Sequence, residues 1–168
     1  LPLIIKAREM GYETHVFAWE TGAVARDHCD HFYPVSIIEK EKILQMSKDI
    51  SPDAVVSVGS DLASITVNFV ATNIGLTSNS IRCTELTTDK FLMRQRLSAN
   101  GIPCPGFIKA TNSSDLIGIE RLNYPLIIKP VDRSGSRGVT KVEDVKYLKN
   151  AIERGISESF HKEVVIEE

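Results

Sequence analysis

A lysine and a glycine-bearing loop lie close together in the stretch 123–139. The apolar run Leu126-Ile-Ile128 predicts a buried strand that ends at Lys129, and Gly135 and Gly138 follow a few residues later. A lysine ammonium is a point charge suited to phosphate oxygens, and glycines allow backbone N–H groups to approach a ligand closely. This order of residue types predicts a site that holds a polyphosphate.

The loop differs from the two common glycine-rich phosphate motifs. No Gly-Lys-Ser/Thr follows its glycines, and its spacing is Gly-x-x-Gly without the Gly-x-Gly that opens a dinucleotide-binding turn. Arg133 and Arg137 add positive charge to it, and a predicted helix then leads to the apolar strand Val164-Val-Ile166. That strand ends in Glu167 and Glu168, so the arrangement is lysine, glycine loop, helix and acidic strand end.

This arrangement resembles the ATP-grasp fold, as in biotin carboxylase and the large subunit of carbamoyl phosphate synthetase. The resemblance extends over about Thr87 to Glu168, and the earlier α/β part is similar to the domain that precedes the ATP-grasp unit in that superfamily. The separated pieces occur in the superfamily's order, and they are 88–90, 101–106, 124–130, 134–139 and 164–168.

The resemblance implies a role for each matched residue. Lys90 and Lys129 correspond to two lysines that bind the nucleotide phosphates, and Glu167 and Glu168 correspond to the hinge beside the adenine. The mobile loop that closes over the phosphates corresponds to Ser134, Gly135, Ser136, Arg137 and Gly138. Without the resemblance, Lys90 would be interpreted as a solvated helix lysine, whereas Lys129 at the end of an apolar strand needs a partner or water.

The implied chemistry is ATP-dependent ligation of small-molecule substrates. A carboxylate or bicarbonate attacks the γ-phosphate, and an amine then displaces phosphate from the acyl phosphate, so the protein's task is positioning and charge neutralisation. The implied cofactors are ATP and Mg²⁺, with the magnesium ligands expected beyond Glu168. We assign no catalytic residue and no metal ligand within the chain, and the resemblance is compatible with a homodimer.

Two alternatives stay open at this point. The first is a non-catalytic module whose α/β part recognises a small metabolite, in which Ser60 or Asp61 after a buried strand could touch the ligand. The simpler interpretation of this pair is a helix N-cap, since Asp and Ser are preferred there. The second alternative keeps the ATP-grasp fold and changes the reaction, for example to carboxylation of a purine precursor or formation of carbamoyl phosphate.

The composition limits the class of protein. The net charge of −2 gives no excess of positive charge for nucleic acid or an anionic membrane. The apolar runs are strand-length, short of the roughly twenty residues that span a bilayer. Three dispersed cysteines predict neither a disulfide framework nor a Cys-x-x-Cys zinc site, and we expect a cytoplasmic protein.

The histidines suggest no metal centre at this level. Asp27-His-Cys-Asp-His31 gathers several ligand types, but adjacent loop residues rarely converge on one ion. His15 alternates within a predicted strand and His161 precedes one, so both are interpreted as packing or surface residues.

The predicted fold class is α/β, with a parallel-sheet, Rossmann-like pre-ATP-grasp domain followed by the first α+β lobe of an ATP-grasp domain. We expect the first domain over 1–86 with its first strand missing, a helix and linker over 87–106, and an incomplete nucleotide-binding subdomain over 107–168. Both ends therefore look cut.

Several elements should position the candidate residues. Periodicity and Gly/Pro signals predict helices over 1–10, 39–49, 62–73, 87–100 and 113–120, with Thr87 as an N-cap. Strands are expected at 14–18, 32–35, 54–58, 107–110, 126–128 and 164–168.

Overall fold

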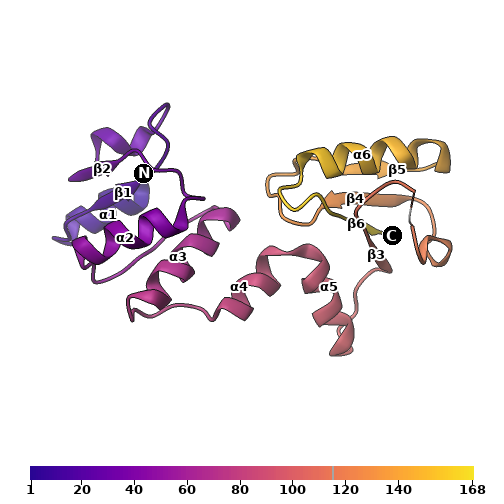
Figure 1. The fold of residues 1–168 in the computed structure, drawn as a ribbon, viewed down its shortest axis with the longest axis horizontal. Coiled ribbons are helices and arrows are strands. Elements are labelled where there is room, and N and C mark those ends of the chain that lie inside the picture. The colour runs from indigo at the N-terminus through magenta and orange to yellow at the C-terminus, as the bar shows by residue number, and fades with distance from the viewer. Residues whose placement is uncertain (115) are drawn as a thin grey trace. The chain divides into compact units, whose positions relative to one another are not determined.

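The computed structural model describes residues 1–114 and 116–168, which form two compact units (Figure 1). The first unit is Leu1–Ile81 and the second is Arg82–Glu168. The three-part division expected from the sequence stays a prediction, and each unit is described by itself.

The first unit is a mixed α/β structure with a two-stranded parallel sheet. β1 pairs with β2 in the register His15↔His31 and Phe17↔Tyr33. Its elements are α1 (Pro2–Glu9), β1 (His15–Phe17), η1 (Val24–Asp27), β2 (His31–Tyr33), α2 (Lys40–Ile50) and α3 (Asp61–Asn73), and α4 (Ile81–Thr88) begins at its end. The small core joins Val35, Ile43 of α2 and Val70 of α3.

The prediction of a strand at 54–58 is wrong. This segment forms no strand, and Val56 and Val58 are 63% and 77% exposed. An apolar run becomes a strand only where a neighbour accepts its N–H and C=O groups, and the described residues place no paired strand beside it. The interpretation of the pair Ser60-Asp61 as a helix N-cap is confirmed for Ser60. Its side chain caps α3 by accepting from the Ala63 N–H at 3.2 Å.

The second unit is built on a four-stranded antiparallel sheet with the order β3-β6-β4-β5. β6 is central, so both neighbours of this last strand are present. The elements are α5 (Lys90–Ala99), β3 (Phe107–Ala110), η2 (Ile119–Arg121), β4 (Leu126–Pro130), β5 (Thr140–Val142), η3 (Val145–Tyr147), α6 (Leu148–Glu158) and β6 (Val164–Glu167).

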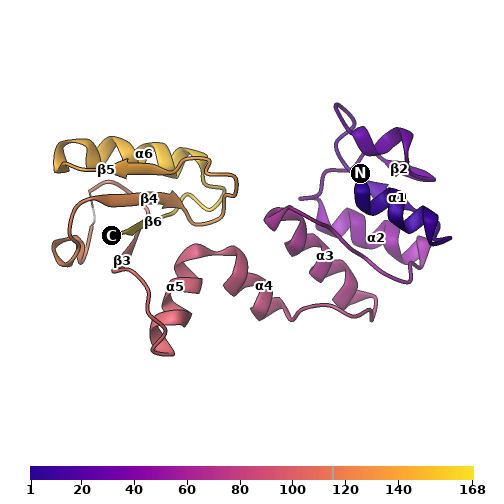
Figure 2. The same cartoon turned by 180° about the vertical axis from the view of Figure 1, so that it is seen from behind.

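The two faces of this sheet are covered differently. Leu126, Ile128, Val164 and Ile166 point to one face and form the main core with Ile152 of α6. Since successive side chains of a strand alternate between faces, Lys129 and Glu167 point to the other face, against which α5 packs. Figures 1 and 2 show α6 along one side of the sheet and α5 on the other.

Two helix predictions in this unit need correction. Thr87 is not an N-cap but lies in the last turn of α4, where its hydroxyl donates to the Cys83 carbonyl at 2.9 Å. The cap of α5 is Asp89, whose carboxylate accepts from the Leu92 N–H at 2.9 Å, because α4 occupies the residues before it. The helix expected at 113–120 is replaced by the short η2, since Gly118 adopts a left-handed φ of +88°. Residue 115 of that range lies outside the described residues.

Among the described residues, no helix combines the length and apolar character needed to cross a bilayer. The two units have the expected fold class, a parallel α/β part followed by an α+β part with an antiparallel sheet.

Candidate nucleotide-binding site

A buried carboxylate organises the cations on the α5 face of the sheet. Glu167 on β6 has a side chain only 4% exposed, and its Oε2 accepts from the Lys129 ammonium at 2.6 Å. Arg94 of α5 donates to the same carboxylate from Nε at 3.0 Å and from a terminal nitrogen at 3.2 Å. Two cations against one anion leave a net charge of +1 on this group, which therefore favours an additional anion.

The electrostatics of Glu167 follow from these contacts. Burial raises the pKa of its carboxyl, and the hydrogen bonds from Arg94 and Lys129 lower it by more, so the pKa lies below its ordinary value. The carboxylate is therefore ionised and holds the Lys129 side chain in one place.

Arg94 was missed in the sequence analysis. It lies four residues after Lys90, so both project from the same side of α5. That spacing was the available signal, because two cations at i and i+4 on a helix that packs beside an acidic strand end can share one site.

Lys90 begins α5 directly beside the end of β4. Its backbone N–H donates to the Val131 carbonyl at 3.0 Å, and its ammonium donates to the Arg133 carbonyl at 2.5 Å. A first-turn helix N–H has no partner within its helix, so the strand end supplies one here. The contacts bring Lys90 to the residues that follow Lys129, which places both lysines at the same end of β4.

The glycine loop leaves the strand at this end. Ser134 to Arg137 are exposed, whereas Gly138 is buried. Gly135, Ser136 and Gly138 have left-handed φ values of +67°, +57° and +71°. A Cβ on Gly138 would lie 2.7 Å from Pro130 Cγ, so the return of the loop to the sheet requires glycine.

The base of the loop contains polar atoms with unused capacity. Asp132 Oδ2 accepts from the His161 N–H at 2.7 Å and the Ser159 hydroxyl at 3.1 Å, while its Oδ1 is buried without a partner among the described residues. The Arg133 guanidinium lies 4.4 Å from the Phe160 ring centroid, and its Nε has no described hydrogen-bond partner. His161 itself is exposed, which agrees with its interpretation as a surface residue.

Glu168 follows β6 and contacts a different part of the unit. Its Oε1 accepts from the Asn123 backbone N–H at 2.8 Å and from the Asn123 amide at 2.9 Å. Its own N–H donates to the Gly106 carbonyl at 3.1 Å. Glu168 thus forms hydrogen bonds with the segments that precede β3 and β4. The structure does not bring its carboxylate to the cluster of Lys129, Arg94 and Glu167.

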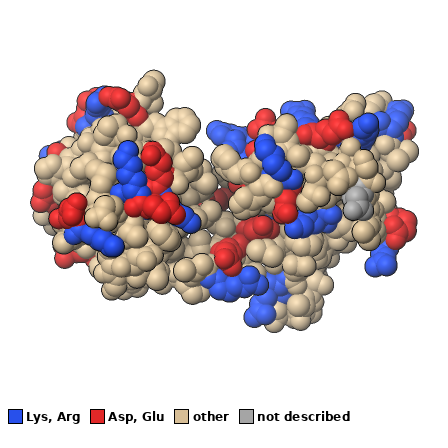
Figure 3. All heavy atoms as spheres, in the orientation of Figure 1, with Lys and Arg blue, Asp and Glu red and all other residues tan. Residues whose placement is uncertain are grey.

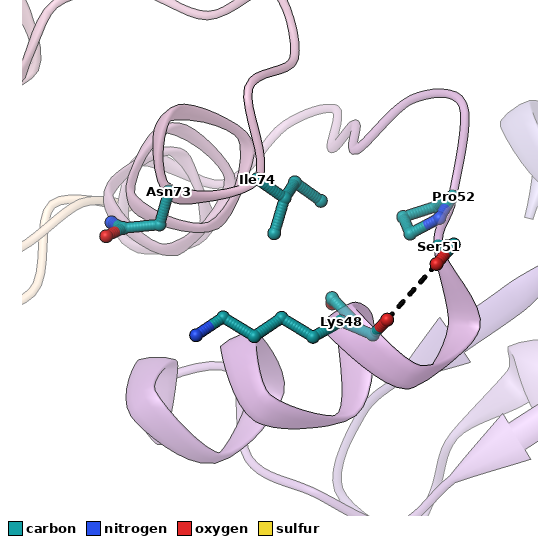
Figure 4. A pocket seen from close by; sticks show the side chains of 6 residues that line it. Lys48, Ser51, Pro52, Asn73 and Ile74 are labelled. Atoms are coloured by element: carbon teal, nitrogen blue, oxygen red, sulfur yellow. Dashed lines mark hydrogen bonds between the residues drawn. The ribbon is translucent and has the colours of Figure 1, made fainter.

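A hollow of ≈ 300 Å³ lies in the first unit, away from these residues in the sequence. Figure 4 shows Lys48 of α2 facing Ile74 after α3, with Pro52 beside them. Its polar groups are mostly engaged, because the Ser51 hydroxyl donates to the Lys48 carbonyl at 3.1 Å and the Asn73 amide donates to the Phe69 carbonyl at 2.8 Å. The hollow therefore offers a metabolite few convergent polar groups.

Positive and negative side chains are interspersed over each unit in the view of Figure 3. The cationic cluster on α5 and β4 is thus a local feature of the second unit, consistent with the overall net charge of −2.

The fold and the site define a protein in which a parallel α/β part precedes, along the chain, a lysine-bearing antiparallel sheet with a glycine loop. Among known families, the one described as "ATP-grasp domain" matches residues 87–163. A D-alanine–D-alanine ligase of Ralstonia pickettii is 32% identical over 82 residues, which are 48% of this chain and 25% of the relative. The chain thus spans about a quarter of the length of such curated relatives.

Solved structures agree on the fold. L-amino acid ligase from Bacillus licheniformis superposes with a TM-score of 0.79 at 23% identity, covering 99% of this chain and 41% of that chain. The biotin carboxylase domain dimer of Hydrogenobacter thermophilus 2-oxoglutarate carboxylase, solved with MgADP, ADP and bicarbonate, gives 0.75 at 16% identity and covers 99% and 41%. The match to the ATP-grasp domain lies within the second unit, and these solved structures share the fold of the chain.

Proposed function

We propose that this chain is the ATP-binding part of an ATP-grasp ligase that activates a carboxylate, or bicarbonate, as an acyl phosphate for attack by an amine. The observation that carries the proposal is the convergence of Lys90, Lys129 and the glycine loop at one end of β4. A triphosphate is the common ligand that matches several cations beside exposed backbone N–H groups.

In this proposal Lys129 and Lys90 bind the phosphates, and Ser134 to Gly138 close over them. Glu167 acts as a positioning residue, because its carboxylate holds the Lys129 ammonium at 2.6 Å. The end of β6, with Glu167 and Glu168, lies beside the adenine. The exposed loop with its left-handed residues supports this assignment, since it can move without breaking the buried sheet.

The proposed reaction has two displacements. A carboxylate oxygen attacks the γ-phosphorus and ADP leaves, which gives an acyl phosphate; an amine nitrogen then attacks the acyl carbon and inorganic phosphate leaves. Lys90 and Lys129 neutralise charge that develops on the phosphoryl oxygens. The substrates would be a small-molecule carboxylate and an amine, and we expect the reaction to occur in the cytoplasm.

Magnesium is the usual companion of a transferred phosphoryl group, and the carboxylate beside Lys129 fits it poorly. Mg²⁺ requires free oxygen ligands, whereas the Glu167 carboxylate is taken by Arg94 and Lys129. We therefore expect these residues to bind ATP without turning it over.

The proposal is tested by equilibrium titration of the chain with ATP and with ADP. Lys90→Ala should weaken ATP binding by about 10- to 100-fold, since a charge-assisted hydrogen bond is worth about 1.5–3 kcal/mol. Lys141→Ala is the control, because Lys141 on β5 is 56% exposed and pairs with Glu143. The Lys141→Ala variant should bind ATP as tightly as the unmodified chain does. A chain that ignores both nucleotides would favour the non-catalytic metabolite module.

A further inference from the structure

Two histidines and a glutamate converge in the first unit, outside the proposed nucleotide site. The parallel register of β1 and β2 sets His15 opposite His31, and their rings stack with centroids 4.5 Å apart. Glu13 precedes β1, and its Oε1 lies 2.6 Å from His31 Nε2 and 3.6 Å from His15 Nε2. One ligand atom from each of the three side chains lies within 4.8 Å of the others.

The backbone beneath this cluster is fixed by reciprocal hydrogen bonds between Thr14 and Asp30. The Thr14 N–H and hydroxyl donate to Asp30 Oδ2 at 2.9 and 2.7 Å, and the Asp30 N–H donates to the Thr14 hydroxyl oxygen at 3.0 Å. The His31 N–H then donates to the Thr14 carbonyl at 2.9 Å. Since Thr14 lies between Glu13 and His15, and Asp30 precedes His31, these hydrogen bonds fix the backbone from which the three side chains project.

Tyr33 can set the tautomer of His15. Its hydroxyl oxygen lies 2.9 Å from His15 Nδ1. When Nδ1–H donates to this oxygen, the lone pair of Nε2 is available on the side of Glu13 and His31. Such an outer hydrogen bond is a common feature of metal-binding histidines, because it orients the ring and raises its basicity.

We propose that Glu13, His15 and His31 form a binding site for a divalent transition metal, with Zn²⁺ as the ion of choice. Two imidazoles and one carboxylate are a ligand set of zinc sites that leave the fourth position to water. Tetrahedral zinc places its ligand atoms about 3.3 Å apart, given bonds of about 2.0–2.1 Å. The separations of 2.6 and 3.6 Å lie on either side of that value, and binding of one ion requires the two stacked rings to rotate until both Nε2 lone pairs point at it.

The three side chains are partly exposed, which suits a site whose ion exchanges with solvent. The side chains of His15, His31 and Glu13 are 22%, 48% and 67% exposed, so the ion has an entry path and room for a water ligand. Imidazole nitrogens favour zinc and related transition metals over Mg²⁺ and Ca²⁺, which select oxygen ligands.

Contiguous residues of the sequence do not reveal this cluster. Of the run Asp27–His31, only His31 belongs to the cluster, and its partners come from the other strand. The register of β1 and β2 brings residues sixteen positions apart together, which the spacing alone did not reveal.

Zinc titration of the full chain by calorimetry tests the proposal, with the Co²⁺ absorption spectrum as a second measurement. We expect one Zn²⁺ per chain, a tetrahedral Co²⁺ spectrum and no response to Mg²⁺. His31→Ala and Glu13→Gln should each weaken Zn²⁺ binding at least tenfold, and Tyr33→Phe should do so to a smaller extent. Circular dichroism checks that each variant folds, and the exposed Glu13 makes its substitution the safest of these.

The other histidines and the nearby cysteine serve as controls. His28→Ala, His161→Ala and Cys29→Ser should leave Zn²⁺ affinity unchanged. No Zn²⁺ binding by the unmodified chain would overturn the proposal. Binding that survives folded Glu13→Gln and His31→Ala, or that disappears with Cys29→Ser alone, would overturn it as well.

Discussion

The Lys129 ammonium lies 2.6 Å from Glu167 Oε2, across two neighbouring antiparallel strands. The register pairs Ile127 with Glu167, so Lys129 is the diagonal neighbour of Glu167 on the same face of the sheet. Arg94 reaches the same carboxylate from α5, and the three side chains join β4, β6 and α5. One buried carboxylate thus fixes the lysine that we assign to a phosphate.

Removal of Lys129 tests the structural part of this relationship. In Lys129→Ala, Glu167 stays buried with Arg94 as its remaining cation, and we expect the free energy of unfolding to fall by about 1–3 kcal/mol. Urea unfolding measures the change. Lys141→Ala removes an exposed ion pair on the adjacent strand and should change the free energy by no more than about 0.5 kcal/mol. Equal effects of the two substitutions would contradict this account.

The Glu167 ion pairs also predict how stability depends on pH. The pKa of Glu167 is lowered in the folded chain, although burial opposes this, because Arg94 and Lys129 favour the carboxylate. Its contribution to stability is therefore fully present above the unfolded value of about 4.3 and is lost as the pH falls through the lower folded value.

Urea unfolding between pH 7 and pH 3 measures this contribution. We expect the free energy of unfolding to decline below about pH 4.3, and the decline to be shallower in Glu167→Gln. An identical pH dependence of the two proteins would show that Glu167 titrates alike in the folded and unfolded chains.

Gly135 and Gly138 form a matched pair for the glycine loop. Both have left-handed φ, at +67° and +71°, but a Cβ meets nothing within 4 Å at Gly135 and Pro130 Cγ at 2.7 Å at Gly138. Gly135→Ala should cost about 1–2 kcal/mol of unfolding free energy for its backbone alone. Gly138→Ala should cost a further 1–3 kcal/mol or so for the steric overlap. Equal losses of unfolding free energy in the two variants, measured by thermal or urea unfolding, would contradict the packing role of Gly138.

Local signals in the sequence predicted much of the fold. Helices α1, α2 and α3 follow from periodicity with Gly or Pro after their ends, and the strands at 107–110, 126–128 and 164–168 occur where apolar runs predicted them. These elements combine local propensity with a neighbour that the chain supplies. The segment 54–58 has the same apolar character but no paired neighbour among the described residues. Its pattern therefore predicted a strand that does not form.

The candidate site was predictable only in part. Lys129 and the glycine loop are adjacent in sequence, so their spacing could indicate a phosphate site. Arg94 requires the packing of α5 on β6, and the cluster of His15 and His31 requires a strand register. Such relationships are tertiary, and a linear motif does not contain them.

The most direct test of the central claim is an ATP titration of the ¹⁵N-labelled chain followed by amide chemical shifts. We expect the largest shifts at Lys90, over 129–138 and at Glu167 and Glu168, with saturation by ATP and weaker effects from ADP. No shift with either nucleotide, or shifts confined to the hollow beside Lys48 and Ile74, would contradict a triphosphate site at the end of β4.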